Sequence, residues 1–301
     1  MYLPIIFAIL ADAMRKIKTY IIALCAVVGL CSCDFLERNK PLVNEIGKTV
    51  VAELTSEEQS APEAETPVEA ATGDDSLLKQ TVPDGTEEQI LTRTGYIVSY
   101  NKDTRLPNWV AWHLTADRTE GPAKRSDADF EADIDVPAPR AEDSDYYGSG
   151  YDRGHMCPAA DNKYSAEAMR ESFLFTNMCP QNSNLNRGDW NELEMACRRW
   201  AGRYGGVYIV SGPVLYKGRH KTIGRNKVVV PEAFFKVVLR TGAEPKAIGF
   251  IYRNAEGNRP KGDYVNTVDE VERITGFDFF PSLPDDVEKA VEATADIAEW
   301  E

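Results

Sequence analysis

The sequence predicts one α+β domain over residues 89–283, and three observations carry that prediction. Short runs rich in β-branched and aromatic residues have the length of strands. They lie on both sides of one long stretch that has the 3.6-residue period of a helix. The 301-residue chain is 43% hydrophobic and 10% aromatic, which is a globular composition and excludes a wholly disordered protein.

The shorter elements are predicted from residue composition and from the turn-forming residues that separate them. Strands are expected at residues 96–100, 109–114, 207–211, 227–230, 233–239 and 247–251. Short helices are expected at 165–172 and 269–275, and Gly276 closes the second because glycine readily adopts the left-handed conformation at a helix end. A polar, acidic loop is expected at 116–150.

Residues 189–204 carry the strongest helical pattern. One face of the predicted helix is formed by Trp190, Leu193, Glu194, Cys197, Arg198 and Ala201. Asp189 is the expected N-cap, and Gly202 with the Gly205–Gly206 pair is expected to end the helix.

Two charged residues, Glu194 and Arg198, interrupt that otherwise apolar face. As an exposed i, i+4 pair they would add only about 0.2–0.5 kcal/mol of stability. A charged pair on a partly buried face needs further polar partners, and a cleft would supply them. The pair is therefore a first indication of a functional site on this helix.

The N-terminal segment is typical of a bacterial export signal. A basic cluster precedes the apolar run 21–30, which is too short to span a bilayer comfortably as a helix. The following Leu30-Cys31-Ser32-Cys33 resembles a lipobox, in which Cys33 would carry lipid and become the first mature residue. Residues 1–32 are therefore predicted to be a lipoprotein signal peptide, with Met14 as a candidate start. An uncleaved signal anchor is the alternative.

This signal predicts a protein of the bacterial cell envelope. The chain would be membrane-anchored through the lipid on Cys33 and would face the periplasm or the cell surface. Residues 33–88 are rich in Glu, Ala, Pro, Ser and Thr, so they are predicted to be an acidic disordered tether. Residues 284–301 are predicted to be an acidic tail, either helical or disordered.

The net charge of −14 belongs to the two ends of the chain. Residues 1–90 hold 7 basic and 15 acidic side chains, and residues 281–301 hold 1 and 7. Residues 91–280 hold 26 of each, so the predicted domain is neutral. The overall acidity therefore does not exclude a polyanionic substrate such as a nucleic acid.

Three of the six cysteines, Cys157, Cys179 and Cys197, lie in the predicted domain. Their spacing is not that of a metal-binding Cys-x-x-Cys motif. One disulfide with a free thiol and three buried thiols both remain open for a protein of an oxidising envelope.

A short polar motif, residues 151–155 (YDRGH), suits phosphate chemistry. In an extended segment Arg153 and His155 point to one face and Asp152 to the other. A guanidinium binds phosphate oxygens, and an imidazole transfers protons near neutral pH. Further on, just ahead of the long helix, Asn186 offers an amide oxygen, which is a hard ligand that suits Mg²⁺.

From about residue 94 to residue 283 the chain resembles the DNA/RNA non-specific endonucleases of the ββα-metal, or His-Me finger, type. The resemblance rests on motifs spread along the domain: 106–110 (LPNWV), 152–156 (DRGHM), 177–181 (NMCPQ) followed by Asn186, Trp190, Leu193, Glu194 and Arg198, then 211–213 (SGP), 231–236 (PEAFFK) and 275–281 (TGFDFFP). It departs at Cys157, where the family more often has Ala; this thiol beside the catalytic His would make the site sensitive to oxidation.

The resemblance implies a fold, an activity and a metal. The fold would have a mixed or antiparallel sheet core with a ββα-metal active-site motif. The activity would be hydrolysis of phosphodiester bonds in DNA, RNA or both, with little sequence specificity, leaving a 5′-phosphate and a 3′-hydroxyl. Mg²⁺ would be the cofactor, with Mn²⁺ as a substitute.

The resemblance also assigns roles to the residues of these motifs. His155 would be the general base that takes a proton from the attacking water. Asn186 would be the only direct protein ligand of the hydrated Mg²⁺, and Glu194 would hold a metal-bound water. Phosphate charge would be neutralised by Arg153 and Arg198. Asn177 would help to set the site, and Asp152 would fix the local backbone.

Three other functions stay open on the sequence. A catalytically inactive nucleic-acid-binding lipoprotein could share the fold, although every expected catalytic residue is present. A thiol hydrolase would pair Cys157 or Cys179 with His155, but no clear orienting group accompanies them. A zinc hydrolase would need a cluster of ligands, whereas His113 and His220 are expected to be structural or solvated.

Overall fold

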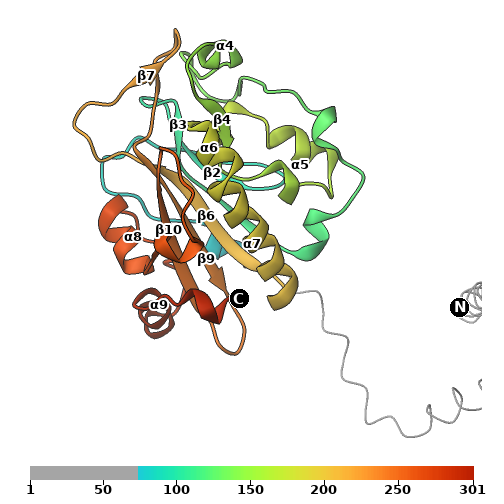
Figure 1. Cartoon of the computed structure of the whole chain (residues 1–301), viewed down its shortest axis with the longest axis vertical. Helices are drawn as coiled ribbons and strands as arrows, with labels where there is room; N and C mark the ends of the chain where they lie inside the picture. Colours follow the sequence, from blue (N-terminus) through green and yellow to red (C-terminus); the bar gives the residue numbers. More distant parts are fainter. Residues whose placement is uncertain (1–73) are drawn as a thin grey trace, which may run out of the picture. The chain divides into compact units, whose positions relative to one another are not determined.

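The computed structural model describes residues 74–301, which fold around a seven-stranded antiparallel sheet (Figure 1). The strands lie in the order β1 (Gln89–Thr92), β2 (Ile97–Asn101), β3 (Leu106–Leu114), β6 (Val207–Val214), β9 (Ala233–Arg240), β10 (Lys246–Arg253) and β11 (Val265–Asn266). Every neighbouring pair is antiparallel. The α+β class and the antiparallel sheet core are therefore confirmed. The predicted signal peptide, Cys33 and most of the predicted tether lie outside the described residues.

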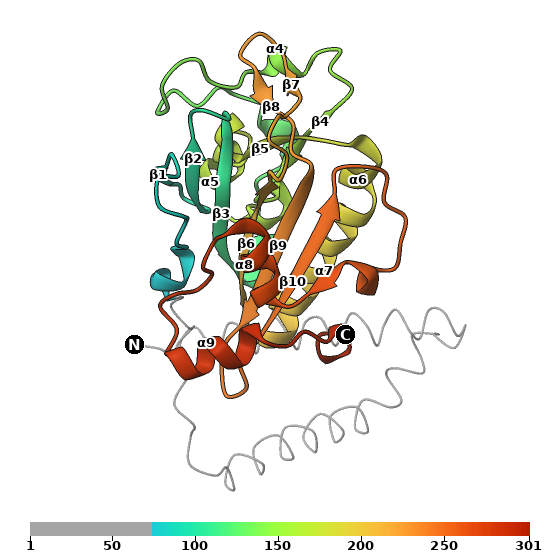
Figure 2. The same ribbon diagram turned by 90° about the vertical axis from the view of Figure 1, so that its left-hand side faces the viewer.

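Helices cover both faces of this sheet (Figure 2). Helix α7 (Asp189–Tyr204) lies on one face, and α8 (Val268–Thr275) and α9 (Asp285–Glu292) lie on the other. Successive side chains of strand β9 point to opposite faces of the sheet and so contribute to both cores. Phe234 belongs to the core beneath α7, whereas the next residue, Phe235, belongs to the core that α8 and α9 complete. The two helical layers are thus separated by the sheet.

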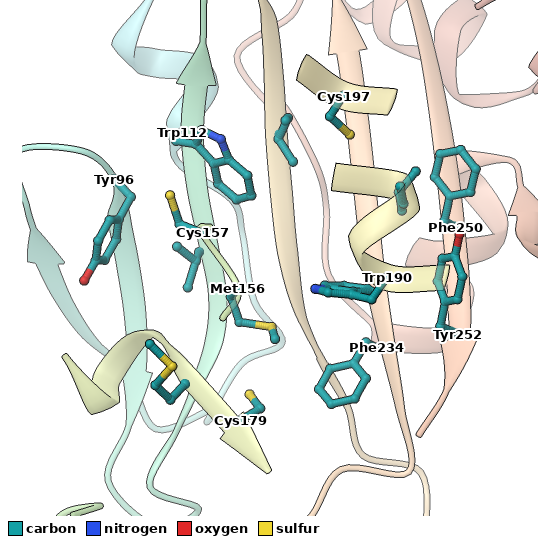
Figure 3. Close-up of a cluster of buried hydrophobic side chains, with 14 of the residues drawn as sticks. Tyr96, Trp112, Met156, Cys157, Cys179, Trp190, Cys197, Phe234, Phe250 and Tyr252 are labelled. Atoms are coloured by element: carbon teal, nitrogen blue, oxygen red, sulfur yellow. The ribbon is translucent and has the colours of Figure 1, made fainter. Parts of the chain in front are cut away.

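Large aromatic side chains fill the core between α7 and the sheet (Figure 3). The Trp190 ring of α7 packs edge-on against Tyr252, with ring centroids 5.7 Å apart, and lies 5.6 Å from Phe234. The predicted bounds of this helix and its end at Gly205 are confirmed, but the N-cap and the place of Gly202 differ from the prediction. Gly188 is the N-cap, and Gly202 lies inside the helix. Gly205, with a φ of 77°, ends it.

A second, two-stranded sheet lies beside α7 and holds the sequence motifs. Strand β4 (Asp152–His155) pairs antiparallel with β5 (Met178–Gln181), and the chain then forms α6 (Ser183–Arg187) and α7. This arrangement of two strands followed by a helix is the expected ββα motif. The domain also contains the short α-helices α4 (Asp143–Tyr146) and α5 (Ala166–Glu171) and the strand pair β7 (Thr222–Ile223) and β8 (Val228–Val229).

Both ends of the described chain pack onto the domain. Leu77 and Leu78, which fall in the predicted tether, are buried in the core beneath α8 and α9. The predicted acidic tail, residues 284–301, is folded: it forms α9, and its Trp300 is 1% exposed with its ring centroid 5.0 Å from that of Trp200. The charged residues of this segment other than Glu288 and Glu292 are exposed, and its few apolar residues supply most of the attachment. Within residues 74–301, no helix is both long enough and apolar enough to cross a membrane.

Candidate active site

His155 ends strand β4 with its ring buried between aromatic side chains. The ring centroid lies 5.0 Å from that of Phe173, edge to face, and 5.8 Å from that of Phe130. The side chain is only 7% exposed, and its Nε2 has no hydrogen-bond partner among residues 74–301. The Trp190 indole nitrogen donates to the His155 carbonyl at 3.3 Å, which fixes the backbone. A buried, partnerless ring nitrogen is costly unless a molecule from solution uses it.

The surroundings keep this imidazole neutral. Burial, followed by the nearby positive charge of Arg125, lowers the pKa of His155 to about 3. A neutral ring retains a lone pair, which a general base needs. Arg125 was not singled out from the sequence. It lies in the polar loop 116–150, and its guanidinium lies 5.1 Å from the centroid of the Phe173 ring. No local pattern marks it, because its neighbours at the site come from distant parts of the chain.

The two sides of β4 separate as the extended YDRGH motif predicts. The Arg153 guanidinium lies 4.4 Å from the centroid of the Phe130 ring, which also packs near His155, and it pairs with Asp143. Asp152 bonds instead to α6, accepting from Ser183 Oγ at 2.9 Å and from Asn186 Nδ2 at 3.1 Å. The expectation that Asp152 fixes the local structure is confirmed.

Asn186 is half-buried on α6, and its orientation is set by Asp152. Because the amide nitrogen donates to the Asp152 carboxylate, the amide oxygen is directed away from that carboxylate. One neutral amide oxygen is a hard donor and leaves the other coordination positions of a cation to water and substrate. This donor set fits a strongly hydrated cation such as Mg²⁺.

Glu194 and Arg198 lie half-buried at the edge of the α7 face, and no ion pair joins them among the described residues. Arg198 Nη1 instead pairs with Asp161 Oδ1 at 2.8 Å. Asp161 is 1% exposed and also accepts from the Trp112 indole nitrogen at 3.1 Å. Burial raises the pKa of Glu194 to about 7, against the opposing charges of Lys236 and Arg198. The expected further polar partner of Arg198 is therefore Asp161, which is 37 positions away along the chain.

Lys236 is a second residue that sequence reasoning missed as part of this site. It lies on β9 and is fully buried, with its ammonium 4.4 Å from the centroid of the Trp190 ring and 5.1 Å from that of Trp112. Such faces attract a cation. The strand containing Lys236 was predicted, but only the fold brings its charge beside the carboxylates of Asp161 and Glu194.

Asn177 belongs to the framework of the site and does not face the substrate. Its side chain is fully buried. Oδ1 accepts from Cys157 N at 2.9 Å, and Nδ2 donates to Cys157 O at 2.9 Å and to Ser172 O at 2.8 Å. Within the described part of the chain it makes no contact of the kind a catalytic residue makes, and its bonds agree with the expected role of helping to set the site. It is a positioning residue that holds the backbone just after His155.

Comparison with known proteins bears directly on this geometry. The sequence matches the family of DNA/RNA non-specific endonucleases over residues 73–286. The chain belongs to this family. The family and the ββα fold expected from the sequence are thus confirmed.

Individual proteins that match the chain carry names that agree with this family. The chain is 37% identical to "Nuclease EXOG, mitochondrial" of Mus musculus over 63% of its own length and 56% of that protein's. It is 32% identical to "Endonuclease G, mitochondrial" of Bos taurus over 65% and 70% of the two lengths. The structure titled "Crystal structure of the EndoG/EndoGI complex: Mechanism of EndoG inhibition" matches with a TM-score of 0.63 and 30% identity, covering 65% of this chain and 87% of that one. The chain spans less than two thirds of the EXOG relatives that it matches.

The cysteines do not support a thiol enzyme. Cys157, Cys179 and Cys197 are all free and buried. Burial raises the pKa of Cys157 to about 12 and that of Cys179 well above its usual range, so neither is held as a nucleophilic thiolate. Cys157 is also fully buried, which argues against the expected sensitivity to oxidation. Of the two alternatives left open by the sequence, the structure shows three buried thiols.

The other histidines have structural contacts. His113 stacks on Tyr208 with ring centroids 4.3 Å apart, and His220 lies 3.1 Å from a Glu232 carboxylate oxygen. In residues 74–301, the one group of three His, Cys, Asp or Glu side chains close enough to share a metal ion does not include His155. The donor set around His155 therefore does not suit a zinc hydrolase.

Proposed function

We propose that this chain is a metal-dependent endonuclease that hydrolyses phosphodiester bonds of DNA, RNA or both with little sequence specificity. The observation that carries the proposal is the buried, neutral His155, whose Nε2 has no partner among the described residues. Membership of the DNA/RNA non-specific endonuclease family supports it. The presence of every residue that the resemblance assigns to catalysis favours an active enzyme over an inactive binding protein.

His155 would take the proton of the attacking water on its imidazole ring. The aromatic rings of Phe130 and Phe173 hold the imidazole in place, and the Trp190 bond to its carbonyl holds the strand. Because Arg125 and burial keep the ring neutral, the base is ready at every physiological pH.

We propose Mg²⁺ as the cofactor, with Mn²⁺ as a substitute. When bound, the cation would supply positive charge to the phosphate and to the leaving 3′ oxygen. Asn186 would hold the cation through the amide oxygen. The hydrogen bond from the amide nitrogen to Asp152 keeps that oxygen directed away from the Asp152 carboxylate. Glu194 would accept hydrogen bonds from water near the cation. These residue types are hard oxygen donors, as the cation requires.

Positive side chains would hold the nucleic-acid backbone. Arg153 lies on the same side of β4 as His155. Arg125 lies close enough to His155 to lower the pKa of its imidazole. Arg198 keeps one edge on Asp161 and can present the other to a phosphate. Contacts to phosphates carry no base information, which accounts for cleavage at many sequences. The products would be a 5′-phosphate and a 3′-hydroxyl.

The role of metal is tested by removing the cation or its ligand. Supercoiled plasmid and a long RNA are incubated with the purified chain in Mg²⁺, in EDTA, and with Asn186→Ala in Mg²⁺. Cleavage of at least one polymer in Mg²⁺ is expected. EDTA should abolish it, and Asn186→Ala should lower the rate about 10–100-fold or more because the cation is held less tightly. Equal rates with and without EDTA would refute the proposal.

We also propose that the protein is lipid-anchored through Cys33 in the bacterial cell envelope, on its periplasmic or cell-surface side. The basic cluster, the short apolar run and the lipobox-like residues 30–33 support this. Radiolabelled palmitate should enter the wild-type protein and not Cys33→Ala. Equal labelling of the two, or no labelling of either, would contradict the anchor.

A further inference from the structure

A group of carboxylates lies on the sheet face opposite α7, where α8 and α9 approach each other (Figure 2). Asp269 and Glu272 come from α8, and Glu292 is the last residue of α9. Each offers one carboxylate oxygen, and the three oxygens lie within 4.8 Å of one another. Asp269 is exposed, Glu272 is half-buried and Glu292 is buried, so the group leads from solvent to the core.

Glu292 gives a second, independent indication that the group has a ligand. Its side chain is only 7% exposed, and its Oε1 is shielded from solvent without any hydrogen-bond partner in residues 74–301. Glu288, one turn earlier on α9, has an Oε1 in the same condition. A buried carboxylate oxygen without a donor is costly, and a cation would satisfy it.

Basic side chains do not supply that compensation. Arg273 of α8 is engaged elsewhere, at 2.6 Å from the exposed Glu270. No ion pair to Asp269, Glu272 or Glu292 occurs in the described part of the chain. Burial first, and then the surrounding carboxylates, which include Asp278 and Glu288, raise the pKa of Glu272 to about 7 and that of Glu292 to about 8.

We propose that Asp269, Glu272 and Glu292 form a calcium-type divalent-cation site that joins α8 to α9. Oxygen ligands lie roughly 2.3–2.6 Å from Ca²⁺, so two oxygens on one ion are at most about 5 Å apart. The three carboxylate oxygens lie within 4.8 Å of one another, which satisfies this condition. Proteins usually hold Mg²⁺ through one or two carboxylates with several waters retained, so a group of three carboxylates favours the larger ion here.

Local contacts prepare the site. Glu272 Oε1 accepts from Phe279 N at 2.9 Å, which orients its carboxylate. Exposed Asp269 leaves one side open to water, which completes the coordination of Ca²⁺ in many proteins. Val271 on α8 and Val291 on α9 lie in the same apolar core, so a bridging ion would reinforce an existing contact between the helices. The site is structural and lies across the sheet from His155.

The test uses the full-length chain freed of metal. Thermal unfolding is followed in NaCl and in CaCl₂ of equal ionic strength, for Asn186→Ala and for Asn186→Ala with Glu292→Gln. The Asn186→Ala background removes the proposed catalytic metal ligand. Asn186→Ala with Glu270→Gln is the matched control, because it also removes one charge from this region but from the exposed pair with Arg273.

Ca²⁺ at one hundred times its Kd is expected to raise the Tm by roughly 5–10 °C in the background and in the Glu270→Gln control. The shift should be largely lost with Glu292→Gln. Equilibrium dialysis with radioactive Ca²⁺ should show one bound ion fewer in Glu292→Gln than in the control. Equal Tm shifts in Glu292→Gln and the control, or no shift beyond that of NaCl, would overturn the site. Failure of nuclease activity would not affect either readout.

Discussion

His155→Ala is expected to lower the rate of phosphodiester cleavage by about 10²–10⁴-fold, the usual contribution of a general base. Nε2 of His155 has no partner among the described residues, whereas His113 stacks on Tyr208 and His220 contacts Glu232. The domain should stay folded. The ring makes aromatic contacts with Phe130 and Phe173, but its ring nitrogen contributes no hydrogen bond that folding requires.

The pH dependence of stability gives the same substitution a second readout. The folded pKa of His155, about 3, is below the unfolded value of 6.5, so the unfolded chain binds the extra proton between these pH values. Wild-type stability should therefore fall as pH is lowered from 6.5 towards 3, by an order of a few kcal/mol. His155→Ala should show a shallower fall in urea unfolding across that range.

His113→Ala is the control, because His113 stacks on Tyr208 away from the ββα motif. Its cleavage rate should stay near that of wild type. Cleavage by His155→Ala at the wild-type rate would remove this histidine from the chemistry. Loss of activity in both histidine variants would indicate a general structural effect instead.

Asn177→Leu is expected to destabilise the domain by about 2–5 kcal/mol and to abolish most of the activity. The change removes three hydrogen bonds from the core and leaves the N–H and C=O of Cys157 and the C=O of Ser172 without their partner. Because Cys157 follows His155 by two residues, the backbone that places the imidazole would loosen.

The free energy of unfolding in urea measures this effect. Asn184→Leu serves as control, since Asn184 is exposed and its side chain makes no hydrogen bond among the described residues. Its stability should change by less than about 0.5 kcal/mol. A loss below about 1 kcal/mol for Asn177→Leu would show that these bonds do not hold the loop.

Local patterns predicted much of the fold. The 3.6-residue period gave α7 its bounds, and β-branched runs marked β2, β3, β6, β9 and β10. The paired strands β4 and β5 are four residues each and contain Gly154 and Pro180, so they lack a strand pattern. Residues 284–301 are strongly acidic, which conceals the few apolar contacts, such as that of Trp300, that attach them.

The site was predictable where a motif carries the chemistry and less so where partners are distant in sequence. His155 and Arg153 share one side of β4, and Asn186 is bonded to Asp152 of the same strand. The partner of Arg198 is the buried Asp161 of another segment, and Arg125 and Lys236 reach the site only through folding. A buried Asn that bonds to backbone also looks, in sequence, like one that binds substrate.

The ends of the cleaved strand test the central claim most directly. Attack by a water deprotonated at His155 should break the bond from phosphorus to the 3′ oxygen. Nicked plasmid made by the chain in Mg²⁺ should therefore be resealed by a DNA ligase without further treatment, because its nicks carry a 5′-phosphate and a 3′-hydroxyl. Nicks that the ligase cannot seal until a 3′-phosphate is removed would contradict the account, as would failure to cleave both the plasmid and a long RNA.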